Sequence, residues 1–236
     1  HAKTGGDLIL TARREDALNA LKAELERAHG INVHVIALDL GAEGGAQTLV
    51  DKVADSGLRV DILINNAGFG GQGAHIDREL AAEQAMIDLN VKALVTLTHA
   101  FGTQMVAQGG GKILNVGSSA GFMPGPNQAV YFATKAFVNS FSQAVDQELR
   151  AKGVTCTLLA PGYVETEFAD VADLRGTGLV RGAVTPASVA KHGYAAMQRG
   201  ALLTVNEVML GFVLRWILPL APRRLVLKVL QKMQAK

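Results

Sequence analysis

Short apolar segments alternate with helical patterns over most of this chain, and that alternation restricts the fold more than any other feature. Apolar runs at 7–12, 32–38, 60–64, 112–116 and 154–159 predict strands. Helices are predicted at the stripe of Leu18, Leu21 and Leu25 that stops at Gly30, and at 43–56, 79–107 and 129–151. Near-continuous apolar strands separated by helices are typical of a parallel sheet buried on both faces. The sequence therefore predicts an α/β fold, a doubly wound parallel sheet with helices on both faces.

The composition indicates a single domain that binds a small molecule. With 236 residues, of which 49% are hydrophobic, the chain can bury a substantial core. The 23 basic residues nearly balance the 21 acidic ones, which argues against nucleic acid as a partner. The single cysteine, Cys156, excludes an intrachain disulfide, and with no CxxC or histidine cluster no metal site is predicted. A lone cysteine, no N-terminal signal pattern and no apolar run of about 18 residues favour a cytoplasmic protein.

Polar or glycine-rich residues follow the end of each predicted strand. Parallel strands present their carboxyl ends at one edge of a sheet, and ligands bind there. The residues expected to line this edge are Arg13, Asp39, Asn66 to Gly68, Ser118 and Pro161 to Thr166. One continuous binding edge is therefore expected.

Ser118, Tyr131 and Lys135 form the most informative group at that edge. Tyr131 and Lys135 are four residues apart and share one face of the predicted helix, while Ser118 precedes them across a Gly/Pro-containing loop. A phenol has a pKa of about 10, and a neighbouring ammonium favours its ionised form. A hydroxyl can hold the reacting oxygen nearby. The trio suits proton transfer to or from an alcohol or carbonyl oxygen, although YxxxK alone is common in helices as a half-buried Tyr with a solvated Lys.

An ordered set of short motifs carries a family resemblance. It comprises NNAG at 65–68, an asparagine within LNVKAL (Asn90), Ser118 thirteen residues before Tyr131, the YxxxK pair, and PGYVET at 161–166. In this order the motifs resemble the short-chain dehydrogenase/reductase family in its compact form, from Asp7 to about Gly200. The resemblance implies a Rossmann-like fold and an NAD(P)-dependent oxidoreductase acting on CH–OH or C=O groups.

The resemblance also implies a role for each matching residue. Tyr131 corresponds to the general acid/base, Lys135 to the residue that lowers its pKa and binds the nicotinamide ribose, and Ser118 to the hydroxyl that orients the substrate oxygen. Asn90 corresponds to the residue that holds a water in a proton relay to Lys135. The other implied cofactor contacts are Asp39 and Leu40 at the adenine, Asn66, Ala67 and Gly68 along the adenosine half, and Pro161, Gly162, Val164 and Thr166 near the nicotinamide carboxamide.

Cofactor choice follows from the charge after the first predicted strand. In the family an acidic side chain there binds the ribose and repels a 2′-phosphate, whereas an arginine pairs with that phosphate. This chain has Arg13 and Arg14 at that place, so NADP is expected in preference to NAD. The alternative for Arg14 is a solvated charge at a helix start, and Arg13 carries more of the argument.

Two parts of the family pattern do not appear in the sequence. A first strand and a glycine-rich TGxxxGxG turn precede the matching region in the family, and His1–Gly6 resembles the last turn of the helix after them. That strand belongs at the centre of the sheet, and the turn holds the cofactor pyrophosphate. We expect the polypeptide to have these residues ahead of His1, because an open slot would leave backbone groups unpaired. A truncated fragment and a natural variant that fills the gap otherwise are the alternatives.

The segments around the predicted site are apolar and indicate a hydrophobic ketone or alcohol as substrate. They contain Phe69, Phe122, Met123, Pro124, Tyr163 and Phe168, several of which are alternatively ordinary core. His99 lies in a helical pattern and is predicted to be a packed or surface residue. Residues 169–185 are rich in glycine and small residues, which favours a mobile lid over the substrate.

The last part of the chain differs in composition. We therefore expect a division into an oxidoreductase domain at 1–205 and a basic, apolar helical extension at 206–236. Gly211–Lys236 combines Trp216 with many Leu and Val, six Lys or Arg and no acid. Such a segment can lie on an anionic membrane surface. It can equally cap the substrate cleft or pack against another subunit, the commoner role of an apolar C-terminal helix, and the family resemblance implies a homodimer or homotetramer.

The motifs together predict an NADP(H)-dependent oxidoreductase that moves a hydride between nicotinamide and a hydrophobic carbonyl or alcohol. The alternative is a catalytically silent dinucleotide-binding or scaffolding protein of the same fold. An epimerase or dehydratase using the same Tyr131 and Lys135 is disfavoured by the NNAG motif.

Overall fold

The computed structural model describes residues 1–168, 172–173 and 184–234. The chain forms two compact units, His1–Arg59 and Val60–Lys236. The described strands form two separate sheets, one of two strands and one of four. The predicted boundary at 205–206 stays a prediction.

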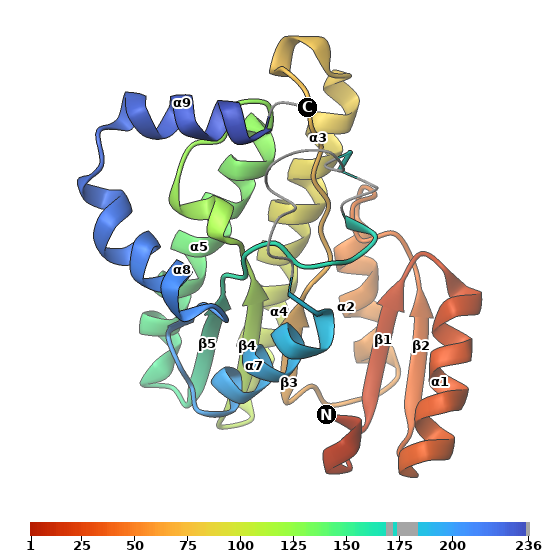
Figure 1. Cartoon of the computed structure of the whole chain (residues 1–236). Helices are drawn as coiled ribbons and strands as arrows, with labels where there is room; N and C mark the ends of the chain where they lie inside the picture. The colour runs from red at the N-terminus through yellow and green to blue at the C-terminus, as the bar shows by residue number, and fades with distance from the viewer. Residues whose placement is uncertain (169–171, 174–183, 235–236) are drawn as a thin grey trace. The chain divides into compact units, whose positions relative to one another are not determined.

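The first unit is a βαβα segment, coloured red to orange in Figure 1. Its elements are a 3₁₀ turn η1 (Ala2–Thr4), β1 (Leu8–Ala12), α1 (Glu15–His29), β2 (Val33–Ala37) and α2 (Gly45–Asp55). The two strands are parallel, with Ala12 opposite Ala37. α1 ends at Gly30, whose left-handed φ of 64° lets its amide donate to the Glu26 carbonyl. Both strands therefore run their carboxyl ends to the same edge of the sheet.

The second unit contains a four-stranded sheet in the order β3-β4-β5-β6, with every pair parallel. Its strands are β3 (Ile62–Asn65), β4 (Gly111–Val116), β5 (Val154–Leu159) and β6 (Leu203–Thr204). Its α-helices are α3 (Leu80–Ile87), α4 (Leu94–Ala107), α5 (Ala129–Arg150), α7 (Pro186–Gln198), α8 (Val208–Phe212) and α9 (Arg223–Gln234). The shorter turns are η2 (His75–Asp77), η3 (Asp88–Ala93), η4 (Ser119–Phe122), η6 (Val213–Ile217) and η7 (Leu218–Leu220), of which η3 and η6 are π-helical.

Helices cover both faces of this sheet (Figure 1). Successive side chains of a strand point to opposite faces. Leu158 of β5 packs with Leu94 and Val138 of α4 and α5, while the next residue, Leu159, packs with Val189 of α7 on the other face. The predicted α/β class with a parallel sheet between helices is confirmed.

The element boundaries are close to those predicted, with one difference. The helix predicted over 79–107 is interrupted, since α3 passes into a π-helical segment at Asp88–Ala93 before α4 begins. A π-helical turn widens the helix by one residue, and such turns are frequent at functional sites. The wide turn contains Asn90.

Candidate active site

Ser118, Tyr131 and Lys135 are brought together by β4 and α5. Ser118 lies just past the end of β4 and caps η4, where its hydroxyl accepts from the Ala120 amide at 3.1 Å. The Ser118 side chain lies near enough to the Tyr131 hydroxyl to lower its pKa. Lys135 Nζ donates to the Val116 carbonyl, at the end of β4, at 2.8 Å. The side chains that the sequence predicted to converge therefore do so.

Burial sets the acid–base properties of the two titratable groups. It raises the pKa of Tyr131 to about 12, and the neighbouring Ser118 side chain acts in the opposite direction. Burial also lowers the pKa of Lys135 to about 8. The charge of Lys135 is not a cause of the Tyr131 shift, so the predicted lowering of the Tyr131 pKa by Lys135 stays a prediction. A phenol with this pKa is protonated near neutrality and is a weaker acid than a free tyrosine.

Asn90 ties the NNAG turn to α5. Its Nδ2 donates to the Phe69 carbonyl at 2.9 Å and to the Thr134 hydroxyl at 3.1 Å, and its Oδ1 accepts from the Phe69 amide at 3.1 Å. Gly68 lies directly against this network. A Cβ at Gly68 would come within 2.9 Å of Asn90 Oδ1 and 3.6 Å of Lys135 Nζ. The NNAG turn, the π-helical turn and Lys135 therefore meet at one place, as the sequence predicted.

Asn139 is a site residue that the sequence analysis missed. Its Nδ2 donates to the Ser118 carbonyl at 3.0 Å, and its Oδ1 accepts from the Ser118 amide at 3.4 Å. Two glycines make room for it, since a Cβ at Gly117 or at Gly121 would lie within 2.4 Å of the Asn139 amide group. A signal was present, because Asn139 follows Tyr131 and Lys135 at successive spacings of four and so continues their helix face.

The PGYVET segment follows β5 and is held by backbone hydrogen bonds. The Pro161 carbonyl accepts from the Ser119 amide at 2.9 Å, which links the segment to the turn after Ser118. Val164 pairs with Val184 in an isolated parallel bridge. The Thr166 hydroxyl accepts from the Phe168 amide at 3.2 Å. The structure thus places 161–166 beside the catalytic turn, while most of the predicted lid at 169–185 lies outside the described residues.

The predicted adenosine-side residues of the first unit lie at the carboxyl edge of its sheet. Arg13 and Arg14 are exposed and follow β1 directly. Asp39 and Leu40 come two and three residues after β2, and the Asp39 carboxylate accepts from the Gly41 amide at 2.9 Å. Because β1 and β2 are parallel neighbours, these two pairs share one edge.

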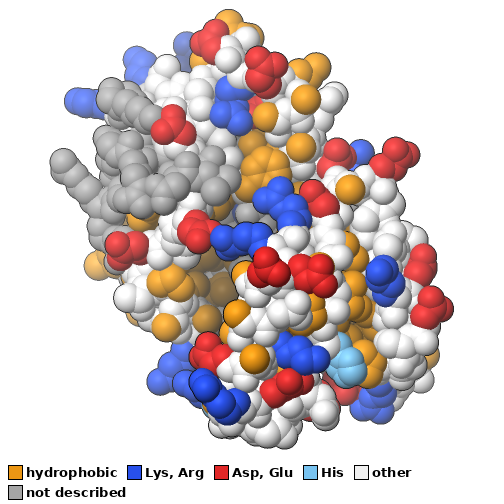
Figure 2. Space-filling model, turned by 90° about the vertical axis from the view of Figure 1, so that its right-hand side faces the viewer, with side chains coloured by type: hydrophobic (Ala, Val, Ile, Leu, Met, Phe, Trp, Pro, Cys, Tyr) orange, Lys and Arg blue, Asp and Glu red, His pale blue; other side chains and the backbone are white. Residues whose placement is uncertain are grey.

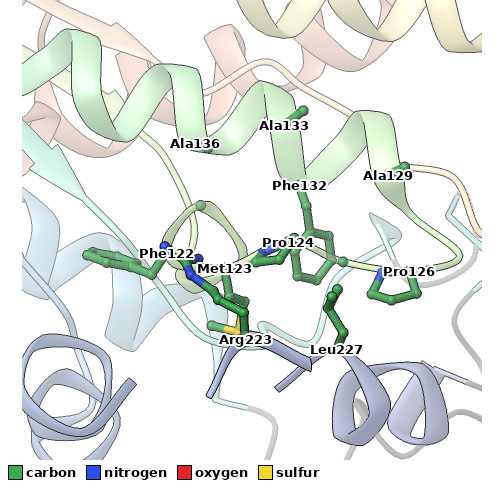
Figure 3. A pocket seen from close by; sticks show the side chains of 12 residues that line it. Phe122, Met123, Pro124, Pro126, Ala129, Phe132, Ala133, Ala136, Arg223 and Leu227 are labelled. Carbon is green, nitrogen blue, oxygen red and sulfur yellow. The ribbon is translucent and has the colours of Figure 1, made fainter. Parts of the chain in front are cut away.

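The apolar residues predicted around the site fall into two groups. The Phe168 ring packs on Tyr131 with a centroid separation of 5.4 Å. Phe122, Met123 and Pro124 instead line a cavity of about 570 Å³ between the loop after η4, α5 and α9 (Figure 3). The α5 residues that face this cavity are Ala129, Phe132, Ala133 and Ala136. At 100° per residue, Tyr131 lies on a different face of α5, so this cavity adjoins the catalytic segment from behind.

In the described part of the chain, neither charged side chains nor possible metal ligands gather at one place. Figure 2 shows acidic and basic side chains interspersed on one face. The described residues contain no group of three His, Cys, Asp or Glu that could hold a metal ion. Cys156 is buried, and burial together with the nearby Asp146 raises the pKa of its thiol to about 12.

Comparison with protein families gives one match, to the short chain dehydrogenase model, over residues 1–174. Among curated proteins, sulfoacetaldehyde reductase 2 of Chromohalobacter salexigens is 42% identical over 170 residues, which cover 71% of this chain and 66% of that protein. The NADP-dependent 3-hydroxy acid dehydrogenase YdfG of Escherichia coli O157:H7 is 37% identical over the same shares. The chain thus spans 66% of the length of both relatives.

Solved structures give the same fold. A short-chain dehydrogenase from Sphingobium yanoikuyae in complex with NADPH matches 92% of this chain and 83% of its own, with a TM-score of 0.83 and 29% identity. The bulky-bulky ketone specific alcohol dehydrogenase from Comamonas testosteroni matches 88% and 78%, with a TM-score of 0.77 and 26% identity. A short-chain dehydrogenase/reductase from Burkholderia phymatum in complex with NAD matches 91% and 84%, with a TM-score of 0.80 and 25% identity.

Proposed function

Because this chain belongs to the short-chain dehydrogenase family, we propose that it is an NADP(H)-dependent oxidoreductase acting on a hydrophobic carbonyl or alcohol. The observation that carries the proposal is that Tyr131, the neighbouring Ser118 hydroxyl, a buried Lys135 and the Asn90–Gly68 contact lie at one place. The coarser assignment, an NAD(P)-dependent dehydrogenase or reductase, is supported by the NADP-dependent relative and by both cofactor-bound structures.

Tyr131 is the proton donor and acceptor in this proposal. In the reducing direction its phenol, which is protonated near neutrality, gives a proton to the substrate oxygen. Ser118 offers its hydroxyl to the same oxygen and so holds it within reach of Tyr131. In the oxidising direction the phenolate is needed, and the ammonium of Lys135 would stabilise it. A bound nicotinamide would supply or accept the hydride.

The residues present fit a dinucleotide. The absence of a side chain at Gly68 keeps open a surface next to Lys135, and any larger residue would fill it. In the second unit, Asn66, Ala67, Gly68, Lys135 and the 161–166 segment would hold the cofactor. In the first unit, Asp39 and Leu40 would contact the adenine.

Arg13 and Arg14 support NADP over NAD. Two guanidinium groups directly after β1 would pair with a 2′-phosphate, and both are exposed. The NADP-dependent relative and the NADPH-bound structure agree with this choice, whereas the NAD-bound structure shows that the fold also accepts NAD.

The proposal also covers the substrate class, the cellular location and the oligomeric state. Phe168 against Tyr131 gives the reacting group an apolar neighbour, and the Comamonas structure is specific for bulky ketones. A buried, unpaired Cys156 suits a reducing cytoplasm. The protein is proposed to form a homodimer or homotetramer. The boundary between the oxidoreductase domain and its extension is proposed at 205–206.

A panel of ketones and aldehydes, assayed on the full-length protein with NADPH and with NADH, tests the function. We expect NADPH oxidation with bulky apolar ketones, and a higher kcat/KM with NADPH than with NADH. Replacing Arg13 and Arg14 together by Gln should remove that preference by weakening NADPH alone. Tight NADPH binding with no oxidation across the panel would instead identify a silent dinucleotide-binding protein.

A further inference from the structure

The segment after Glu207 exposes an unusual amount of apolar surface. Val208 is 91% exposed, Met209 74%, Trp216 67% and Leu220 85%. These side chains lie on α8, η6 and η7, the blue segment at the left of Figure 1, below α9. Large exposed apolar patches mark interaction sites in folded proteins. This surface therefore calls for a partner.

The outer side of α9 carries an apolar row beside a basic row. Leu225, Val229 and Met233 follow one another at spacings of four and are 57%, 49% and 40% exposed. Arg224, Lys228 and Lys232 form the neighbouring row at the same spacing, and all three are exposed. An apolar row flanked by Lys and Arg is typical of a helix that lies in the plane of a lipid surface.

The other side of α9 holds the helix on the fold. Leu230 and Gln234 are buried, and the Gln234 carbonyl accepts from Gln72 Nε2 at 2.9 Å. Leu227 and Arg223 line the cavity shown in Figure 3. The inward face is thus occupied by this chain's own residues, and the two outer rows are left facing solvent.

The charges of the basic row have no compensation within the described residues. Like charges at spacings of four on a helix repel, and no ion pair forms between this row and any described carboxylate. The sequence has no acid after Glu207. An anionic partner would relieve this repulsion. A second copy of the chain, docked through the same face, would set basic row against basic row.

We propose that the surface formed by Val208–Leu220 and the outer rows of α9 docks on an anionic lipid membrane. The apolar side chains enter the headgroup region, and Arg224, Lys228 and Lys232 bind lipid phosphates. Contact is peripheral, since no described helix is long and apolar enough to cross a bilayer. Charge complementarity decides for a lipid surface over a second copy.

Trp216 gives a direct readout, because it is the sole tryptophan of the sequence and lies within the proposed surface. The full-length protein is titrated with vesicles of phosphatidylcholine containing 30–40% phosphatidylglycerol, roughly the anionic share that gives a strong surface potential, and with phosphatidylcholine alone. We expect a blue shift of Trp216 emission on the anionic vesicles only, reversed by about 0.5 M salt. Equal shifts on both vesicles, or none on either, would overturn the proposal.

Two triple variants that each remove three positive charges distinguish an effect of the basic row on α9 from an effect of net charge. Arg224→Gln, Lys228→Gln and Lys232→Gln together should weaken binding to anionic vesicles on the order of 100-fold, since each basic residue near the surface contributes about tenfold or less. The control removes three exposed charges elsewhere, with Arg27→Gln, Lys52→Gln and Lys152→Gln. Equal weakening of both variants would contradict a specific row. A blue-shifted Trp216 without vesicles, together with a dimer by light scattering, would identify a second copy as the partner.

Discussion

The side chain of Asn139 brackets the backbone of Ser118, donating to its carbonyl at 3.0 Å and accepting from its amide at 3.4 Å. Both residues are buried, with 4% and 8% of their surface exposed. The backbone of Ser118, which we propose orients the substrate, is therefore fixed by α5, the same helix that carries Tyr131 and Lys135. The position of the Ser118 hydroxyl relative to the Tyr131 phenol therefore depends on α5 and its contact with β4.

Replacing Asn139 by Ala should lower kcat while leaving NADPH affinity within about threefold. Loss of the bracket frees the Ser118 backbone and leaves its buried amide without the Asn139 acceptor, while its carbonyl keeps the hydrogen bond from the Gly121 amide at 3.0 Å. An unpaired buried donor costs roughly 1–3 kcal/mol. If most of that cost falls on transition-state placement, kcat drops about 10- to 100-fold. Steady-state kinetics and NADPH fluorescence titration measure the two quantities. Ser140→Ala, at the exposed neighbouring position, is the control and should change neither; a loss confined to thermal stability would show that Asn139 is only structural.

Gly68→Ala should disrupt the site, whereas Gly102→Ala should be harmless. The new Cβ at Gly68 would lie 2.9 Å from Asn90 Oδ1, too close for an ordinary contact, so Asn90 or the NNAG turn must move. Gly102 lies inside α4, and there the nearest atom to an added Cβ is 3.5 Å away. Alanine in a helix interior is favoured over glycine by about 1 kcal/mol. Thermal melts should show a lower stability and NADPH titration a weaker NADPH affinity for Gly68→Ala. The stability of Gly102→Ala should be unchanged or raised. Equal behaviour would contradict the tight contact.

Lys135 should make the protein more stable as the pH rises from about 8 towards 10.5. Its pKa is about 8 in the folded chain and 10.5 in the unfolded chain, so in this window the unfolded state binds the extra proton. The unfolding free energy therefore gains up to about 3 kcal/mol from this group. Tyr131 and Cys156, whose pKa values are raised to about 12, contribute the opposite slope above about pH 9. Urea unfolding of wild type and Lys135→Met, compared at pH 7.5, 8.5 and 9.5, isolates the Lys135 contribution.

The decisive quantity in that experiment is the difference in unfolding free energy between wild type and Lys135→Met. The wild-type stability should increase relative to that of Lys135→Met as the pH rises. Lys152→Gln, which removes an exposed lysine, should run parallel to wild type. Parallel curves for wild type and Lys135→Met would show that Lys135 is not desolvated in the folded chain.

The fold was predictable because its signals are local. Strand β5 was predicted at 154–159 and observed at Val154–Leu159, and α5 begins at the predicted Ala129, since period and length distinguish buried strands from amphipathic helices. The break at Asp88–Ala93 was not predictable, because a single π-helical turn shifts the hydrophobic spacing by only one residue within a long helical pattern. The pairing of the strands into two separate sheets agrees with the sequence, in which the family strand that belongs at the centre of the sheet does not appear.

The placement of Ser118, Tyr131 and Lys135 was predictable for a different reason. Ser118, Tyr131 and Lys135 are fixed by spacing along one strand–loop–helix segment, so their convergence follows once the helix is assigned. Asn139 was not predicted as a site residue, because an asparagine in a helix interior has no distinctive motif. Its spacing from Tyr131 nevertheless placed it on the same face of the helix. The separation of Phe122 from the Tyr131 face needed the structure, since loop geometry after η4 decides which side of α5 it meets.

The central claim, that Tyr131 is the general acid and base, is tested most directly by Tyr131→Phe in the full-length protein. The change removes one hydroxyl and keeps the ring that packs on Phe168. We predict that kcat for the best ketone of the panel falls at least about 100-fold, as expected for loss of a general acid, while NADPH affinity changes less than about threefold. Tyr194→Phe, the same chemical change on α7, should leave kcat unaltered. An undiminished kcat for Tyr131→Phe would contradict the account.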